Sequence, residues 1–324
     1  MLKIFVVIPL YNEASHVADV IRRMPAEVNR IIAIDDCSDD DTLTVVRGIT
    51  DERIRVITHD KNQGVGGAMM SGYKYCLQRN ADIIVKIDGD GQMDPGEIPR
   101  LITPLILKQA DYVKGFRFSD MENLKRMPKI RLFGNIMLSF LTKIASGYWD
   151  IFDPTSGYTA IHKEALSRLN IDRLNKRYFF ETDMLIHLYR IHAVVKDVEV
   201  SINYGNEVSQ LQPLRATPTF AYRLIKAFFT RILWRYFLVD FTAVSLFILL
   251  GLPLLLYGTG FGIYHWISNV MAGISTPTGT IMIAVVSLFF GFQFLLQAVV
   301  LDIQNLPKYP LQHYTTPFAT TNKR

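Results

Sequence analysis

The sequence predicts an α/β fold, a doubly wound and mostly parallel sheet followed by an interfacial helix and two transmembrane helices. Short runs rich in β-branched residues alternate with segments of helical spacing, and polar residues follow each run. Two long apolar runs lie near the carboxyl end of the chain. Alternating strands and helices favour a parallel sheet, in which ligands bind beyond the carboxyl ends of the strands. With 324 residues, the chain can hold a domain of about 200 residues and a second part.

The first predicted strand is Lys3 to Pro9, a buried run that Pro9 is expected to end. Tyr11 and Glu13 fall in the loop that follows this strand. Helical spacing then runs from Ala14 to Met24. The order of strand, polar loop and helix is therefore established at the start of the chain.

The same order recurs twice. A strand at Arg30 to Ile34 runs into Asp35 and Asp36, and a third strand is expected at Ile54 to Thr58. The glycine-rich segment Asn62 to Ala68 then opens a helix. It matches neither the dinucleotide fingerprint nor a P-loop, so we interpret its glycines as allowing close packing against the sheet rather than direct contact with a nucleotide.

A fourth buried strand, Ile83 to Val85, ends in the acidic stretch KIDGDGQMD. Asp88, Asp90 and Gln92 supply oxygen ligands of the kind that suit Mg²⁺ or Mn²⁺, with positions left for the phosphates of a substrate. The alternative is an acidic turn, because Asp and Gly are also common turn residues. The stretch thus predicts a metal site at the edge of the sheet.

Two runs, Tyr236 to Tyr257 and Thr280 to Leu301, are long enough to cross a bilayer, which takes about 20 apolar residues. Asp240 is the only charged residue inside them. Buried core helices are the alternative. The runs predict an integral membrane protein, in a bacterial cytoplasmic membrane or, for a eukaryotic chain, the membrane of the endoplasmic reticulum.

Basic residues flank the two runs, and the connecting segment Gly258 to Gly279 has no Lys or Arg. By the positive-inside rule both termini, and with them the large N-terminal domain, are expected in the cytosol. The N-terminus has no cleavage site of a signal peptide. Cys37 and Cys76 lack metal-site spacing and fit a reducing compartment. We interpret the net charge of +5 as attraction to a lipid surface, not to nucleic acid.

Apolar residues recur at helical spacing between Thr219 and Tyr236, with Arg223 and Lys226 on the other side and Arg231 and Arg235 at its edge. This pattern is typical of a helix that lies in the membrane interface, although a core helix of the soluble domain is an alternative. The predicted organisation is a domain at 1–215, a juxtamembrane amphipathic helix at 216–236 and an anchor at 237–324 with a short cytosolic tail.

Five motifs in order resemble glycosyltransferase family 2, and within it the polyprenyl-phosphate hexosyltransferases such as the dolichyl-phosphate mannose or glucose synthases. The motifs are VVIPLYNE at 6–13, IDDCSDDDT at 34–42, NQGVGGAMMSGY at 62–73, KIDGDGQMDP at 86–95 and DPTSGYTAIHKEAL at 153–166. The resemblance implies a GT-A fold, a UDP- or GDP-hexose donor and a polyprenyl phosphate acceptor, undecaprenyl or dolichyl. It also implies a single displacement with inversion.

The resemblance also implies roles for particular residues. Those for the nucleotide are Pro9, Tyr11, Glu13, Asp35 and Asp36, and those for metal and diphosphate are Asp90 and Gln92, with Asp88 towards the donor. Arg117 and Arg131 match positions that meet phosphates, for which the guanidinium group is suited. Glu181 and Asp183 lie where relatives place a catalytic acidic residue, and they are candidates for binding sugar hydroxyls or acting as a base.

One segment departs from the family pattern. Related mannose synthases carry basic residues near 204–212, whereas this chain has YGNEVSQLQ, which retains Ser209 but has Gln210 in place of a cation. This difference leaves open how the acceptor phosphate is held and weakens the case for mannose. A partial match of 212–216 to the QxxRW motif of processive synthases lacks the tryptophan and is interpreted as chance.

The leading hypothesis is a metal-dependent hexosyltransferase that acts on polyprenyl phosphate. An acceptor such as diacylglycerol is a second hypothesis, in which a hydroxyl group would need a base. A membrane-tethered subunit that binds nucleotide sugars or translocates lipids is a third, and assembly into a homo-oligomer is left open.

Overall fold

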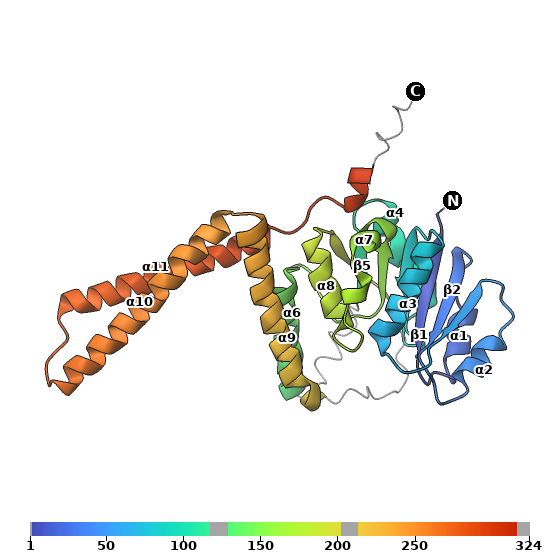
Figure 1. Ribbon diagram of the computed structural model, residues 1–324, viewed down its shortest axis with the longest axis horizontal. Coiled ribbons are helices and arrows are strands. Elements are labelled where there is room, and N and C mark those ends of the chain that lie inside the picture. The colour runs from blue at the N-terminus through green and yellow to red at the C-terminus, as the bar shows by residue number, and fades with distance from the viewer. Residues whose placement is uncertain (1, 117–128, 202–212, 316–324) are drawn as a thin grey trace, which may run out of the picture. The chain divides into compact units, whose positions relative to one another are not determined.

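The computed structural model describes residues 2–116, 129–201 and 213–315 (Figure 1). The chain divides into two compact units. The first comprises Met1–Phe228 and Pro307–Arg324, and the second is Phe229–Leu306. The segment that follows the last apolar helix therefore belongs to the first unit.

The first unit is built on a seven-stranded sheet in the order β3-β2-β1-β4-β6-β5-β7. All its strand pairs are parallel except those made by β6, which runs antiparallel to β4 and to β5. The mostly parallel sheet expected from the sequence is confirmed. The strands are β1 (Ile4–Leu10), β2 (Val28–Asp35), β3 (Ile54–Thr58), β4 (Ile83–Lys86), β5 (Tyr112–Phe116), β6 (Thr159–His162) and β7 (Val195–Glu199).

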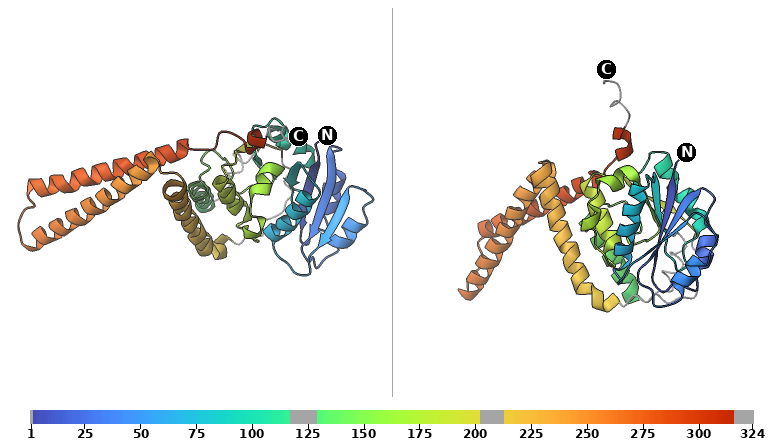
Figure 2. Two further views of the ribbon diagram at one scale, coloured as in Figure 1. Left: turned by 45° about the horizontal axis from the view of Figure 1, so that its top comes forward. Right: turned by 45° about the vertical axis from the view of Figure 1, so that its right-hand side comes forward.

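Helices cover both faces of this sheet, which Figure 2 shows from two further sides. Alternate residues of β1 join the apolar side chains of α1, α2 and α4 in one core cluster. On the other face, Gly72 of α3 lies against Val7 of β1, and a Cβ atom added to Gly72 would lie 2.4 Å from a methyl carbon of Val7. The helices of this unit are α1 (Val17–Arg22), α2 (Thr42–Arg47), α3 (Val65–Gln78), α4 (Ile98–Ile106), α6 (Lys129–Ser146), α7 (Lys163–Arg168) and α8 (Phe180–Arg190).

Two boundaries near the N-terminus differ from the predictions. Pro9 does not end the first strand, because β1 continues to Leu10 and pairs with β2 along its whole length. The pairing of β1 with β4 stops at Val7, so Pro9 lies where one side of the strand has no ladder to interrupt. The first helix is also shorter than predicted, since it begins at Val17 instead of Ala14.

The second unit contains two apolar helices that lie side by side, α10 (Ala243–Met271) and α11 (Thr278–Gln304) (Figures 1 and 2). Both are long and apolar enough to cross a membrane. The predicted first run began too early: α9 (Pro213–Leu233) passes into a π-helical turn at Trp234–Val239, and α10 begins only after Thr242. The Ser245 hydroxyl accepts the backbone N–H of Thr242 at 3.0 Å, which stabilises the new start.

Small residues let α10 and α11 approach closely. Gly251 and Gly258 of α10 face Ala284 and Gly291 of α11, and a Cβ atom at Gly291 would lie 2.5 Å from the backbone nitrogen of Leu255. In each helix these small residues are separated by two turns, which keeps them on one face. Close backbone packing of this kind is common between helices in membranes.

Candidate active site

The loops after β1 and β2 are joined by hydrogen bonds that begin at Asn12. Asn12 has a positive φ of 60°. Its backbone N–H donates to the Ser38 hydroxyl oxygen at 3.1 Å, and its side-chain oxygen accepts the backbone N–H of Asp39 at 2.9 Å. The N–H of Glu13 donates to the Thr42 hydroxyl at 2.8 Å. The structure thus places Glu13 beside the acidic loop.

Tyr11 lies on the same edge and is 45% exposed. Its hydroxyl group donates to Asp39 at 3.4 Å, and the negative charge of Asp39 is the largest cause of a raised pKa of Tyr11. The ring therefore remains a neutral, solvent-facing surface at neutral pH. It is available for contact with a ligand at the carboxyl ends of β1 and β2.

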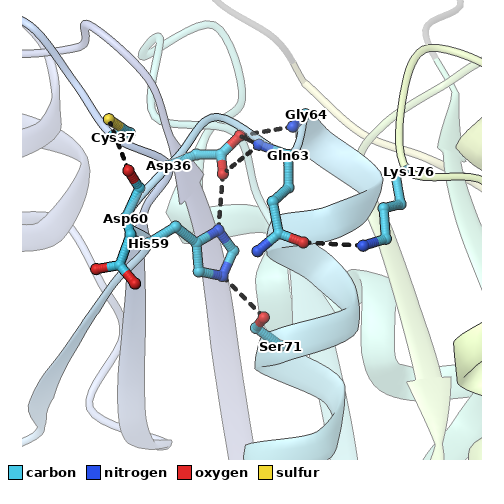
Figure 3. Close-up of polar contacts among 8 residues, drawn as sticks. All are labelled: Asp36, Cys37, His59, Asp60, Gln63, Gly64, Ser71 and Lys176. Carbon is cyan, nitrogen blue, oxygen red and sulfur yellow. Dashed lines mark hydrogen bonds and ion pairs between the residues drawn. The ribbon is translucent and has the colours of Figure 1, made fainter.

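Asp36 is the buried centre of a hydrogen-bond network (Figure 3). Its carboxylate accepts the backbone N–H groups of Gln63 and Gly64, at 2.9 and 2.7 Å, and lies 2.7 Å from Nδ1 of His59. Nε2 of His59 in turn lies 2.8 Å from the Ser71 hydroxyl on α3. Asp36 therefore fixes the loop between β3 and α3. A direct contact of Asp36 with the nucleoside stays a prediction.

Asp35, the last residue of β2, differs from its neighbour. Its side chain is buried, and one carboxylate oxygen has no hydrogen-bond partner among the residues that the structure describes. A buried oxygen without a donor is costly. Asp35 therefore differs from Asp36, whose two carboxylate oxygens both accept N–H groups of the loop before α3.

The glycine-rich start of α3 packs against a loop far along the chain, Asn175 to Arg177. A Cβ atom at Gly66 would lie 2.1 Å from the carbonyl oxygen of Asn175. The N–H of Gly67 donates to the carbonyl oxygen of Lys176 at 3.1 Å. In Figure 3, Lys176 also reaches the side-chain oxygen of Gln63, at 3.0 Å. At the start of α3 these glycines thus serve packing, but against this loop and not against the sheet.

The acidic stretch after β4 forms a tight loop that contacts the end of β1. Asp90 accepts the backbone N–H of Gln92 at 3.0 Å, and Gly91 has a positive φ of 75°. A Cβ atom at Gly89 would lie 2.4 Å from Leu10. Glycine at these two positions therefore lets the loop turn and approach β1 closely. The Asp90 carboxylate thus lies beside the backbone of Gln92, and the predicted convergence of their side-chain oxygens on a metal stays a prediction.

Asp88 makes an ion pair that sequence reasoning missed. Nζ of Lys86, the last residue of β4, lies 2.8 Å from Asp88 and 3.3 Å from Glu181 of α8, and it is almost completely buried. Burial alone lowers the pKa of Lys86, but the charges of Asp88 and Glu181 outweigh it and raise that pKa above its ordinary value. The available signal was a lysine directly after the apolar run Ile83 to Val85.

The two candidate acidic residues of α8 have different surroundings. Glu181 contacts Lys86, whereas Asp183 accepts the backbone N–H of Asn175 at 2.8 Å and lies 3.6 Å from His187. Burial raises the pKa of Asp183, and the charge of His187 opposes this effect. Asp183 thus braces the loop that packs on α3, and Glu181 lies on the side of Asp88.

The side-chain oxygens of the loop after β4 are of the kind that bind a hard divalent cation together with the phosphate oxygens of a substrate. Among the described residues, no group of three or more His, Cys, Asp or Glu side chains is placed to hold a metal ion. One oxygen of Asp88 is held by Lys86, so the candidate ligands on this loop are Asp90, the amide oxygen of Gln92 and the second oxygen of Asp88. A cation held there would need oxygens from a phosphate to complete its coordination.

The structure does not describe the side chains of three predicted site residues. Arg117 and Ser209 lie outside the described residues, and Arg131 lies in α6 with its side chain outside the described part.

Solved structures define the class of fold. The chain aligns with mannosyl-3-phosphoglycerate synthase from Rubrobacter xylanophilus with a TM-score of 0.53 at 17% identity, over 74% of this chain and 77% of that one. Glucosyl-3-phosphoglycerate synthase from Mycobacterium tuberculosis gives a TM-score of 0.52 at 21% identity, over 71% and 80%. These likenesses show the GT-A fold. The model of Glycosyl transferase family 2 matches residues 5–169, about half of the chain, and the chain belongs to this family.

Two curated relatives match over most of their own length. The UDP-N-acetylglucosamine–dolichyl-phosphate N-acetylglucosaminyltransferase of Methanococcus voltae is 33% identical over 62% of this chain and 86% of the relative. The undecaprenyl-phosphate mannosyltransferase of Micrococcus luteus is 27% identical over 62% of this chain and 83% of the relative.

Proposed function

We propose that this protein transfers a sugar from a nucleoside diphosphate to a polyprenyl phosphate at a membrane surface. The observation that carries the proposal is the similarity to two curated transferases named for polyprenyl phosphate acceptors, over more than four fifths of their lengths. The two apolar helices support it, because a lipid acceptor is reached at a membrane. The family supports glycosyl transfer as the reaction class.

The polar edge of the sheet would hold the donor. Tyr11 follows β1 directly and Asp35 ends β2, and both are proposed to contact the nucleoside. Mg²⁺ or Mn²⁺ bound by Asp90 and Gln92 would offset the charge that develops on the departing nucleoside diphosphate. Asp88, on the same loop, would face the sugar. We propose a single displacement with inversion at the anomeric carbon.

The acceptor phosphate is already an anion, so its attack requires positioning more than removal of a proton. The structure offers Asp183 no obvious task as a base, because it braces the loop at Asn175. Arg117, Arg131 and Ser209 remain proposals for holding the phosphate.

We propose that the GT-A domain occupies 1–215, that the helix at 216–236 lies in the membrane interface, and that 237–324 anchors the chain. The chain leaves the first unit before α10 and returns to it after α11. A pair of spans between two segments of one compact unit fits a hairpin, with both termini on the same side. The basic flanking residues favour the cytosol as that side.

The direct test uses the full-length protein in lipid nanodiscs that contain undecaprenyl or dolichyl phosphate. Labelled UDP- and GDP-sugars are added with Mg²⁺ or Mn²⁺, and the lipid extract is analysed for a labelled polyprenyl phosphate sugar. Asp90→Asn is expected to lower the rate at least a hundredfold. Asp172→Asn is a matched control, because Asp172 is an exposed partner of Lys74 away from these loops. Absence of labelled product with every donor would contradict the proposal.

The class of donor can be identified separately by a thermal-shift screen of UDP- and GDP-sugars. A ligand that binds only the native state raises its apparent stability. The acceptor chemistry is tested by Asp183→Asn. A small loss of transfer is expected for a phosphate acceptor, whereas near-complete loss would favour a hydroxyl acceptor such as diacylglycerol.

A further inference from the structure

Two buried lysines lie in one row across the middle of the sheet. Thr159 of β6 pairs with Lys86 of β4 on one side and with Lys114 of β5 on the other. All three side chains are buried, with Lys86 exposed by 1% and Lys114 by 0%. Lysine is rarely buried so fully unless it is paired. Each of these ammonium groups therefore needs a structural explanation.

Both lysines hold the loop that precedes β6. Nζ of Lys114 donates to the carbonyl oxygen of Ser156 at 2.7 Å, and Nζ of Lys86 donates to that of Gly157 at 3.2 Å. A Cβ atom at Gly157 would lie 2.7 Å from Nζ of Lys86 and 2.8 Å from a carboxylate oxygen of Asp88. The ammonium and the carboxylate are thus packed against a backbone that leaves no room for a side chain.

Only Lys86 also contacts carboxylates at ion-pair distance. It joins Asp88 of the acidic loop to Glu181 of α8, at 2.8 and 3.3 Å. Without this ammonium, two carboxylates would share one partly buried site. Oxygen ligands of that kind attract a hard cation. Without the ammonium of Lys86, the carboxylates of Asp88 and Glu181 would therefore compete for the metal.

We propose that Lys86 is a positioning residue whose ammonium binds Asp88 and Glu181 together and so keeps a divalent cation on Asp90 and Gln92. This inference rests on the proposed function, because it concerns the same metal and donor site. It assigns Asp88 away from the metal, whereas the sequence offered Asp88 both as a metal ligand and as a residue directed towards the donor. Lys114 holds the same loop, and the charge of Glu181 acts on it without an ion pair at contact distance between the two side chains.

The test measures binding of Mn²⁺ alone to the full-length protein in detergent, from the electron paramagnetic resonance signal of free Mn²⁺. Lys86→Met removes the positive charge and retains much of the side-chain length. We expect it to tighten Mn²⁺ binding about tenfold, because two partly buried carboxylates lose their counter-charge. Lys86→Met combined with Glu181→Gln should return the affinity to within about threefold of the unmodified protein, since one of the two carboxylates is then neutral.

Lys114→Met is the matched control. It removes an equally buried ammonium from the same row, and it should leave the Mn²⁺ affinity within about threefold, because Lys114 makes its hydrogen bond to a carbonyl group. A variant that merely loosens the fold would weaken Mn²⁺ binding. Unchanged or weaker binding in Lys86→Met overturns the proposal, and so does a tightening that Glu181→Gln fails to reverse.

Glu181→Gln alone gives a second measurement if Lys86→Met does not fold. With Lys86 retained, the site gains net positive charge, and Mn²⁺ binding should weaken by about threefold or more. Unchanged or tighter binding would contradict the role of Lys86. These measurements need no acceptor, so failure of polyprenyl phosphate transfer and failure of this inference are separate results.

Discussion

The carboxylate of Asp111, immediately before β5, accepts the backbone N–H of Leu311, which lies beyond the second apolar helix, at 2.9 and 3.0 Å to its two oxygens. The same carboxylate accepts the N–H of Val194 at 2.9 Å. Next to Leu311, the side-chain amide of Gln312 donates to the carbonyl oxygen of Ala110 at 2.8 Å. These bonds attach the segment that follows the second apolar helix to the start of β5.

We expect Asp111→Ala to lower the free energy of unfolding by about 2–4 kcal/mol, because it leaves two buried N–H groups without an acceptor. Gln312→Ala, which removes one donor to Ala110, should cost about 1 kcal/mol. The measurement is thermal unfolding of the first unit, followed by circular dichroism of the full chain in detergent. Equal melting temperatures of Asp111→Ala and the unmodified protein would show that the returning segment is not held by this residue.

The start of α3 provides a second prediction. Gly66→Ala would place a methyl group 2.1 Å from the carbonyl oxygen of Asn175, so the loop that Asp183 braces must move. We expect a loss of stability of about 2 kcal/mol or more and weaker binding of the nucleotide. Gly48→Ala is the control, because its added methyl group would meet only ordinary contacts at 3.5 Å. Its stability should change by less than about 1 kcal/mol.

The sequence was informative where local pattern decides the structure. Strands buried on both faces are continuous apolar runs, as β1 and β4 are, and the edge strand β3, a short run rich in β-branched residues, was predicted with its observed bounds, Ile54–Thr58. The loops that follow β1, β2 and β4 were found for the same reason. Asp90 and Gln92 are close because they are two residues apart on one loop.

The remainder depends on partners distant in sequence. No local pattern shows that Lys86 meets Glu181, or that the glycines of α3 pack on Asn175 to Arg177. Those contacts form only when separate elements are brought together by the fold. The start of α10 was misplaced because hydropathy continues through residues 236–242, whereas the helix begins after Thr242, whose backbone N–H donates to the Ser245 hydroxyl.

Lys114 gives a prediction about pH. Burial lowers its pKa from 10.5 to about 8, against the opposing effect of the negative charges of Asp153 and Glu181. Between pH 8 and pH 10.5 the unfolded chain therefore binds a proton that the folded chain has lost. Stability should rise with pH in this interval, by up to about 1.4 kcal/mol per pH unit for a single group.

The measurement compares the melting temperature of the unmodified protein with that of Lys114→Met from pH 7 to pH 10. The difference between the two proteins isolates this lysine from other titrating groups. We expect the unmodified protein to gain stability relative to the variant above about pH 8. A difference that stays constant over the whole range would mean that Lys114 keeps an ordinary pKa.

A buried ion pair ties α9 to α11 within the second unit. Both terminal nitrogens of Arg231 contact the carboxylate of Asp302, at 2.7 and 2.9 Å, and the Tyr236 hydroxyl donates to the same carboxylate at 2.5 Å. Arg231 and Asp302 are both buried. The sequence pattern placed Arg231 at the edge of an amphipathic helix and gave no partner for it.

Removing one member of this pair is expected to cost more than removing both. Asp302→Ala leaves a buried guanidinium without its counter-charge and should lower stability by about 3–5 kcal/mol. The double variant Arg231→Met and Asp302→Leu should recover much of this loss, since apolar side chains of similar volume can replace a buried pair. Asp240→Asn is the control, because Asp240 is exposed and lies 4.0 Å from Arg235, so its loss should cost less than about 1 kcal/mol. The measurement is thermal unfolding of the unmodified protein and the three variants in one detergent. A double variant as unstable as Asp302→Ala would show that the charges themselves are needed between α9 and α11.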